Sequence, residues 1–435
     1  MNPIAATFLV VAALALLVLP RKWAPLPLLV GACYMTLGQA VDLGPFRFTV
    51  IRILVLTGLV RVLARGERPA GGLFGLDWLV MVWGGWVLLS SAFHPDPGET
   101  LTFHLGMFYN VLGIYFLFRC FCQSFDDAIR IAKMIAILLV PVALEMLSEK
   151  LLHRNLFAVL GGVGEEPTIR NGRLRAQGPF AVSILAGTVG AVCAPLLVGI
   201  WRKEPLAARV GLAACLLMVV TCASSGPLLS VFAGIAALAF WRWRRFTRHV
   251  WVAAIVGYLL LDLVMKAPAY YLVARVDLVG GSTGYHRAAL IQSSIEHINE
   301  WWFAGTDYTR DWMPYGVGWS EDHADITNHY LGQGVRGGLL LMLLFMSFLW
   351  WGFRAAGQLL RLRPPQDHFF VWCVGAALFV HAVSCTSIAY FDQSFIFIYL
   401  TLAVTASLRA ITSEEVAKSP ETVGIADEEM AANVV

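Results

Sequence analysis

Long apolar segments separated by short polar ones dominate this 435-residue chain. A helix that crosses a membrane needs about 20 predominantly apolar residues. Segments of roughly this length recur along the chain, and each of them predicts a helix. They lie near residues 3–20, 24–41, 48–64, 76–93, 103–121, 130–147, 181–200, 208–224, 227–241, 249–265, 337–353, 369–386 and 393–409. The pattern therefore predicts an all-α polytopic membrane protein with 12–13 transmembrane helices in residues 1–410.

The composition agrees with a membrane protein. Hydrophobic residues make up 58% of the chain and charged residues only 14%, and the mean hydropathy is +0.69. Soluble domains carry about 25% charged residues, so this composition excludes an ordinary soluble domain. The net charge of +3 is spread over the loops and indicates no nucleic-acid partner. The eight cysteines lack zinc-site spacing, and we interpret them as small apolar packing residues.

Basic residues between the apolar segments predict the orientation of the bundle. Lysine and arginine gather at four connections, residues 61–68, 201–209, 241–249 and 353–365. The positive-inside rule assigns these connections to the cytoplasm. Loops 148–180 and 267–336 then lie outside, and the polar tail 411–435 lies inside and is expected to be disordered. No positive charge precedes the first apolar segment, which predicts a helix rather than a signal peptide.

Loop 267–336 carries the richest candidate chemistry. It holds four of the ten histidines and four tryptophans, and loops longer than about 15 residues are usually functional or disordered. Apolar side chains recur in it at helical spacing and predict an amphipathic helix. This apolar stripe consists of Ile291, Ile295, Ile298 and Trp302. His286 and Arg287 stand at the helix start, where an anion is favoured, although Arg287 could instead pair with a nearby acid.

The chain changes from polar to strongly apolar within residues 325–344. Asp325 or Thr327 is expected to cap a helix that enters the membrane. Asn328 and Arg336 would then lie within about 80° of one another around that helix. Three glycines would allow close approach by a partner or a lipid head group. These are Gly334, Gly337 and Gly338. Polar side chains at the start of an apolar helix indicate an amphipathic substrate bound at the membrane interface.

Short motifs follow one another in the two outer loops. They are residues 175–180, 285–290, 302–305 and 328–338. Their order and placement resemble the O-antigen ligase and O-antigen polymerase superfamily of bacterial inner-membrane proteins, which have one large periplasmic loop. Thr327 stands where that family usually has a histidine, and His329 follows two residues later. Ser225 stands where many relatives carry an arginine.

The resemblance implies a metal-independent membrane glycosyltransferase, GT-C-like in fold, without a cofactor. Its donor would be a glycan on undecaprenyl pyrophosphate, and its acceptor a sugar or lipid hydroxyl that attacks the anomeric carbon. Arg287 would bind the diphosphate with support from Arg175 and Arg173, because guanidinium groups pair bidentately with phosphate oxygens. His329 would act as base and Asp325 would orient it. Further substrate contacts are expected from Asn328, Tyr330, Arg336 and His286. Both a polymerase and a ligase fit.

Each of these residues also has a plainer interpretation. His329 could hydrogen-bond a loop carbonyl, Arg175 could anchor its own loop, and Arg336 could bind a lipid head group. Asp322, His323 and Asp325 are of metal-ligand type, but no second cluster accompanies them. Three further polar residues fall inside apolar segments and should face the bundle interior. They are Glu145, Asp262 and His381.

Two other functions remain open from the sequence. One is a flippase or transporter for a lipid-linked sugar, which would need polar residues through the depth of the bundle. The other is a non-catalytic component of a polysaccharide export system. The concentration of polar residues on one side of this chain favours the enzyme.

Overall fold

Each predicted apolar segment contributes to a helix in the computed structural model, which describes residues 1–275, 284–318 and 320–418. The helices are α1 (Pro3–Val18), α2 (Pro25–Tyr34), α3 (Val50–Arg65), α4 (Gly75–Ser90), α5 (Pro97–Phe121), α6 (Phe125–Leu152), α7 (Ser183–Gly199), α8 (Pro205–Thr221), α9 (Ser225–Ala239), α10 (Thr247–Val264), α13 (His329–Leu362), α14 (Pro365–Cys385) and α15 (Phe395–Lys418). Within the described residues, seven helices are long and apolar enough to cross a membrane, against the 12–13 transmembrane helices that were predicted. The chain is therefore an all-α, multi-pass membrane protein.

Two segments differ from the prediction. Segment 24–41 ends its helix at Tyr34, and ten residues rise only about 15 Å, half of a bilayer core. The chain turns there into a hairpin of β1 (Ala40–Leu43) and β2 (Phe46–Thr49). The predicted disorder from residue 411 is also wrong as far as Lys418, because Thr412 is buried and Arg363 pairs with Glu415. Residues 419–435 lie outside the described residues.

Small side chains bring the central helices close together. Gly190 of α7 lies against the Cys215 carbonyl of α8, and Gly211 of α8 lies against Ala136 of α6. All eight cysteines are buried and free, which confirms their interpretation as packing residues. Close contact between small residues is the usual way for helices to associate in a membrane, where burial from water cannot drive packing.

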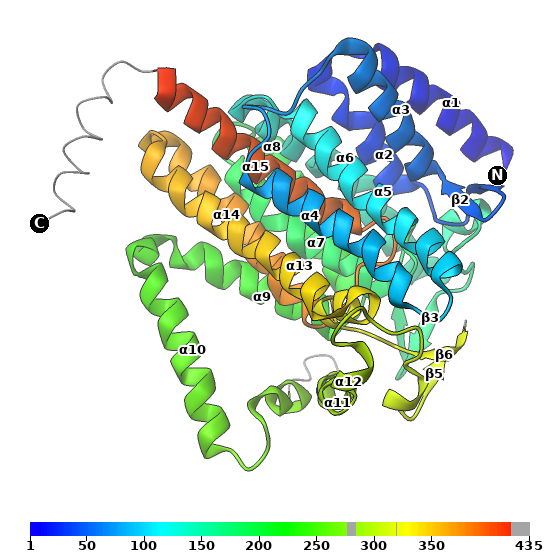
Figure 1. The fold of residues 1–435 in the computed structure, drawn as a ribbon. Helices are drawn as coiled ribbons and strands as arrows, with labels where there is room; N and C mark the ends of the chain where they lie inside the picture. Colours follow the sequence, from blue (N-terminus) through cyan, green and yellow to red (C-terminus); the bar gives the residue numbers. More distant parts are fainter. Residues whose placement is uncertain (276–283, 319, 419–435) are drawn as a thin grey trace, which may run out of the picture.

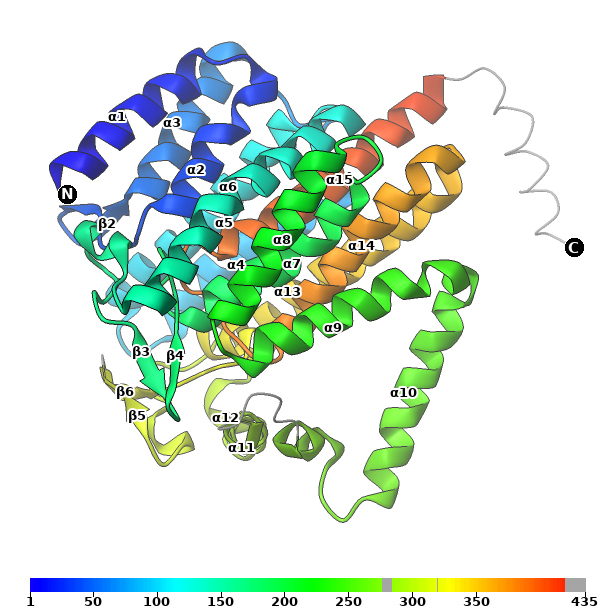
Figure 2. The ribbon, with the colours of Figure 1, turned by 180° about the vertical axis from the view of Figure 1, so that it is seen from behind.

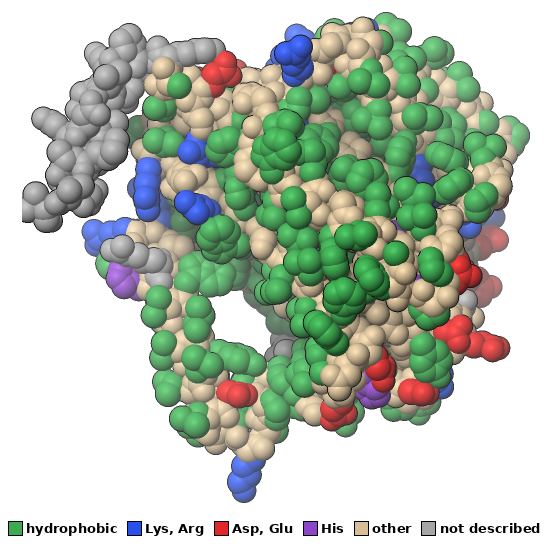
Figure 3. All heavy atoms as spheres, in the orientation of Figure 1, with side chains coloured by type: hydrophobic (Ala, Val, Ile, Leu, Met, Phe, Trp, Pro, Cys, Tyr) green, Lys and Arg blue, Asp and Glu red, His purple; other side chains and the backbone are tan. Residues whose placement is uncertain are grey.

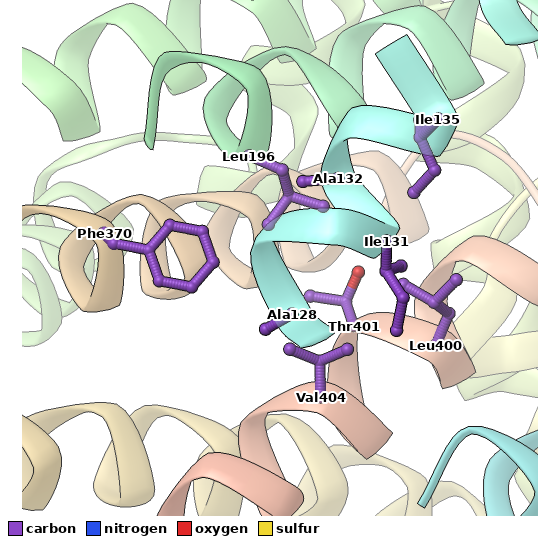
Figure 4. A pocket seen from close by; sticks show the side chains of 9 residues that line it. All are labelled: Ala128, Ile131, Ala132, Ile135, Leu196, Phe370, Leu400, Thr401 and Val404. Atoms are coloured by element: carbon purple, nitrogen blue, oxygen red, sulfur yellow. The ribbon is translucent and has the colours of Figure 1, made fainter. Parts of the chain in front are cut away.

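A small void interrupts this core where α6, α7, α14 and α15 meet (Figure 4). Its volume is about 10 Å³, room for a single water molecule, and Ile131, Leu196 and Phe370 contribute to its apolar lining. Thr401, also in the lining, donates its hydroxyl to the Phe397 carbonyl at 2.7 Å. The void is a packing irregularity rather than a binding site.

The loops separate into two ends of the bundle (Figures 1 and 2). The first, which we call the hairpin end, comprises residues 35–49, 91–96, 153–182, 222–224, 266–328 and 386–394, as far as they are described. The second, the basic end, comprises residues 19–24, 66–74, 122–124, 200–204, 240–246 and 363–364. The four basic connections all meet the basic end, whereas the two long loops lie at the hairpin end.

Helix α10 stands away from the rest of the bundle (Figures 1 and 2). Nearly all of its side chains are exposed and most are apolar, as in a lipid-facing span. Asp262 is exposed on this helix as well, so the expectation that it faces the bundle interior is wrong. Near the basic end Trp251 meets Phe353 and Phe379 at ring distances of 5.9 and 6.4 Å. The space-filling view shows an opening between α10 and the bundle, with apolar side chains on its rim (Figure 3).

The long outer loop forms two helices instead of the single amphipathic one that was predicted. These are α11 (Gly284–Glu296) and α12 (Ile298–Trp301), with a break at His297. The predicted apolar stripe is only partly the packed face. Ile298 packs against the buried cluster that contains Leu290 and Trp301. Ile295 and Trp302 are each about half exposed, at 53% and 51%.

Candidate functional site

Three arginines share one face of the hairpin of β3 (Thr168–Arg170) and β4 (Arg173–Arg175). Asn171 and Gly172 turn the chain with φ angles of 50° and 71°, the conformation of a tight hairpin turn. Arg170 of β3 lies directly opposite Arg173 of β4 in the strand register, and Arg175 follows Arg173 by two residues. All three side chains therefore lie on the same face of the hairpin. Like charges placed side by side repel, and a bound anion would relieve that repulsion.

Arg287 approaches from the second long loop. It lies in the first turn of α11 and exposes only 6% of its surface. A Cβ atom on Gly226 would lie 3.7 Å from Arg287 Nη2 and 3.5 Å from Ser387 Oγ. Because Gly226 belongs to the first turn of α9, the guanidinium lies beside a helix N-terminus. The N-terminal dipole of α9 therefore adds to its positive potential.

Two guanidinium groups at this place each have a buried Nε and are incompletely bonded. Among the described residues, Nε of Arg175 and Nε of Arg287 have no hydrogen-bond partner, and neither side chain forms an ion pair. Burial lowers the pKa of both groups, and the charge of Arg170 lowers the pKa of both further. Arg170 therefore lies within electrostatic range of both groups, and we call Arg170, Arg175 and Arg287 the arginine cluster. A buried polar group without a partner costs about 1–3 kcal/mol, so the cluster favours an anion.

Asp325 and His286 lie beside the cluster. The exposed Asp325 carboxylate raises the pKa of Arg287, against the larger effect of burial. The backbone carbonyl of Asp325 is 3.2 Å from His286 Nε2. Thr327 Oγ1 nearby in the chain is buried and has no hydrogen-bond partner among the described residues. The structure therefore brings both residues to Arg287, as the sequence grouping expected.

His329 is placed differently from an exposed base. Only 3% of its surface is exposed, and its Nδ1 accepts a hydrogen bond from the Tyr390 backbone N–H at 3.2 Å. Its ring packs against Phe345 with ring centres 4.8 Å apart. Gln333 Oε1 accepts a hydrogen bond from the Trp83 indole N–H, and Gln333 Nε2 lies 3.4 Å from His329 Nε2. The ring thus fastens the start of α13 to the loop before α15, and its catalytic role stays a prediction.

Asn328 and Tyr330 also have structural contacts. Asn328 Oδ1 accepts the backbone N–H groups of Tyr330 and Leu331 at 2.9 and 3.2 Å, so Asn328 caps α13. The expectation that Asp325 or Thr327 would be the cap is wrong, because the helix begins later, at His329. The Tyr330 hydroxyl donates to the Ala382 carbonyl of α14 at 2.9 Å. These bonds set the geometry of the helix start beside the cluster.

Arg336 and Arg173 differ from one another in burial. The Arg336 guanidinium lies over the Phe103 ring of α5 at 5.6 Å, and its side chain, like that of Arg175, is half-buried. Arg173 is exposed on the β4 strand. Arg287, with 6% of its surface exposed, is the most buried of the four predicted arginines.

The predicted glycines of α13 are in close contact with another segment of the same chain. The helix breaks at Gly337 and Gly338, and Gly338 has a φ of 75°. A Cβ atom there would collide with the Phe303 carbonyl, while the Leu339 N–H donates to the Trp302 carbonyl at 2.8 Å. The close approach expected from the glycines is thus made by residues 301–305, not by a lipid head group.

The connection 386–394 joins the parts of the site. Tyr390 binds His329, and the Asp392 carboxylate accepts the Ala181 N–H at 2.8 Å. The Gln393 amide donates to the Pro179 carbonyl at 2.8 Å. Because Pro179 and Ala181 follow the β4 strand closely, this connection positions Arg175 as well as the start of α13.

The sequence reasoning missed Arg170 and the connection 386–394. The Asn171-Gly172 pair was the available signal for Arg170, since this dipeptide between short extended segments predicts a hairpin. The connection gave no local signal, because its role depends on partners up to 214 positions away. Among the described residues, no group of three or more histidine, cysteine or acidic side chains could hold a metal ion.

Comparison with known proteins does not assign this chain to a family. No protein-family model matches this chain, and no curated protein matches it. The resemblance to the O-antigen ligase and polymerase superfamily therefore remains a prediction, carried by short motifs and their order. What the geometry adds is that these motifs all lie at the hairpin end, where the Phe303 carbonyl contacts Gly338.

Proposed function

We propose that this protein transfers a glycan from undecaprenyl pyrophosphate to an acceptor hydroxyl at its hairpin end. The observation that carries the proposal is the arginine cluster, in which the Nε atoms of the half-buried Arg175 and the buried Arg287 have no hydrogen-bond partner and neither side chain forms an ion pair among the described residues. A diphosphate supplies the missing negative charge and several acceptor oxygens. Each guanidinium group can bind two such oxygens at once, and the α9 N-terminus adds to the positive electrostatic potential at this place.

The setting in the membrane supports an amphipathic donor. The opening beside α10 is lined by apolar side chains, which suits a polyprenyl chain (Figure 3). The basic end is expected in the cytoplasm by the positive-inside rule, so the hairpin end faces the periplasm of a bacterial inner membrane. The donor's diphosphate would then lie at the membrane surface, with its tail in lipid.

The proposed reaction is a displacement at the anomeric carbon. The acceptor hydroxyl oxygen forms the new bond to that carbon, and the bond from the carbon to the diphosphate oxygen breaks. The electron pair of the broken bond leaves with the diphosphate, whose growing charge Arg175 and Arg287 stabilise. The hydroxyl proton passes to the Asp325 carboxylate, which is exposed beside Arg287.

His329 takes a positioning role in this proposal. Its Nδ1 is already occupied by the Tyr390 N–H, and its ring is buried between aromatic side chains. It therefore holds α13 and its Asn328 cap in place beside the cluster. This assignment replaces the base role that the resemblance implied and gives that role to Asp325.

A transfer assay tests the proposal. The protein in lipid nanodiscs would receive a lipid-linked oligosaccharide and an acceptor glycan, and transferred or elongated glycan would be measured. Arg287→Gln and Arg175→Gln should each reduce the transfer rate about 100-fold or more, since they remove charge stabilisation of the leaving group. Arg209→Gln, an exposed arginine near the basic end, serves as matched control and should keep the full rate.

Two results would contradict the proposal. Full transfer by Arg287→Gln would show that the cluster does not bind the leaving group. Movement of the lipid-linked sugar across proteoliposomes, without any transfer, would favour the flippase. Binding of inorganic pyrophosphate, measured by calorimetry, separates a loss of binding from a loss of chemistry.

A further inference from the structure

A polar cavity lies at the hairpin end, apart from the arginine cluster. Its volume is about 410 Å³, and β2, α3, α5 and the connection 386–394 contribute to its walls. Its polar and aromatic lining includes Arg47, Arg52, Asn110, Phe391, Asp392 and Gln393. A cavity of this size can hold a small organic molecule, in contrast to the void in the core.

Two arginines of this cavity have only neutral partners among the described residues. Arg52 donates Nε to Asn110 Oδ1 at 3.0 Å and Nη1 to the Arg47 carbonyl at 2.6 Å. Arg47 donates Nη2 to the Leu37 carbonyl at 3.3 Å. Carbonyl and amide oxygens orient a guanidinium but leave its charge uncompensated. The cavity therefore carries two positive charges available to an anion.

Asp392 does not cancel this charge. Its two carboxylate oxygens accept backbone N–H groups, from Ser394 at 2.9 Å and from Ala181 at 2.8 Å. Burial raises the pKa of this carboxyl, and these hydrogen bonds oppose the shift only in part. Asp392 thus serves to hold the backbone of the connection, while the arginines face the cavity as cations.

An exposed aromatic ring completes the lining. Phe391 is 54% exposed and presents an apolar ring. Planar polar side chains beside an exposed ring suit a sugar, whose hydroxyls need partners and whose C–H face is apolar.

The cavity and the arginine cluster share one connection. Residues 391–393 line the cavity, while Ser387 of the same connection lies beside Gly226, next to Arg287. A saccharide in the cavity would therefore approach the cluster along a segment of only a few residues. We propose that the cavity binds an acidic saccharide, bearing a carboxylate or a phosphate. Its use as acceptor site rests on the proposed transferase function.

Calorimetry on the full-length protein in nanodiscs tests the binding. The probes are cellobiouronic acid, cellobiose 1-phosphate and neutral cellobiose, so the arms separate carboxylate from phosphate and both from an uncharged sugar. At least one acidic probe should bind at least tenfold more tightly than cellobiose. Arg47→Gln, on the exposed β2 strand, should weaken that binding at least tenfold, and Phe391→Ala should weaken binding of all three probes.

The controls separate this inference from the proposed function. Arg209→Gln and Arg287→Gln should leave the binding of the acidic probe unchanged, while Arg287→Gln should abolish binding of inorganic pyrophosphate. Equal binding of acidic and neutral probes, or no effect of Arg47→Gln, would overturn the cavity assignment. Acidic-saccharide binding without pyrophosphate binding would instead overturn the transferase proposal and leave the cavity assignment standing.

Discussion

At the basic end of the bundle, fully buried arginines meet acids. Arg119 forms two bonds to Asp77, at 2.8 and 2.9 Å, and neither side chain is exposed. Arg61 pairs with Glu67 at 2.9 Å. At the hairpin end, Arg287 is buried and Arg175 half-buried, yet neither forms an ion pair with an acid in the described part of the chain.

The difference indicates two uses of a buried guanidinium. A buried charge is tolerated when its partner is part of the fold, as at the basic end. Where the fold supplies no partner, the charge is costly unless a ligand brings one. The paired arginines therefore connect helices, whereas the unpaired ones mark a place for an anion. Four perturbations test this contrast, beginning with the one that should have the largest effect.

Arg119→Met should destabilise the protein most. The substitution leaves the Asp77 carboxylate buried without its cation, although the Tyr115 hydroxyl still donates to it at 2.6 Å. The expected loss is about 3–5 kcal/mol, measured by denaturant unfolding in detergent micelles. The double variant Asp77→Asn/Arg119→Met should recover part of that loss. A loss below about 1 kcal/mol in the single variant would show that the pair does not hold the helices.

Arg287→Gln should act in the opposite direction on stability. Without an anion present, removal of an incompletely bonded buried cation should raise the unfolding free energy by about 1–3 kcal/mol. Inorganic pyrophosphate at about 100 times its Kd should stabilise the wild type by about 2.7 kcal/mol and leave the variant unchanged. Thermal unfolding with and without pyrophosphate measures both effects. A destabilisation like that of Arg119→Met would make Arg287 a structural residue.

The buried acid of the hairpin end predicts a pH dependence. Burial raises the folded-state pKa of Asp392, so the folded protein holds this proton more tightly than the unfolded chain does. Stability should therefore fall as pH rises from about 4 toward the raised pKa, by at most about 1.4 kcal/mol per pH unit. Asp392→Asn should flatten that slope between pH 4 and 7, as unfolding of both proteins at each pH would reveal. An unchanged slope would assign the pH dependence to other groups.

Lys203→Ala should have the smallest effect. Its ammonium group is 3.4 Å from Asp126, and both side chains are more than half exposed at the basic end. Exposed pairs of this kind contribute little, so unfolding free energy should change by less than about 0.5 kcal/mol. A larger loss would mean that position at the basic end, rather than burial, decides the importance of a pair.

Part of the candidate site could be predicted from its residues, and the errors have local causes. Arg287, His286 and Asp325 lie close together in the structure, and the sequence grouped them because they stand near helix starts in one outer loop. Their roles stay predictions. The packed face of α11 was predicted only in part, because Ile295 is apolar but about half exposed, whereas Leu290 is buried. His329 looked like an exposed base because it follows a polar segment, yet the Tyr390 backbone covers it.

By itself, the sequence determined the membrane class, the number and order of apolar segments, and the separation of basic connections from long loops. These properties depend on short stretches of chain and on their transfer into lipid. Only the tertiary structure decided which arginines have acid partners, which histidine is buried, and where α13 breaks. Those outcomes depend on contacts such as Asp392 with Ala181, 211 positions apart, and no local pattern encodes which distant group will complete a buried charge.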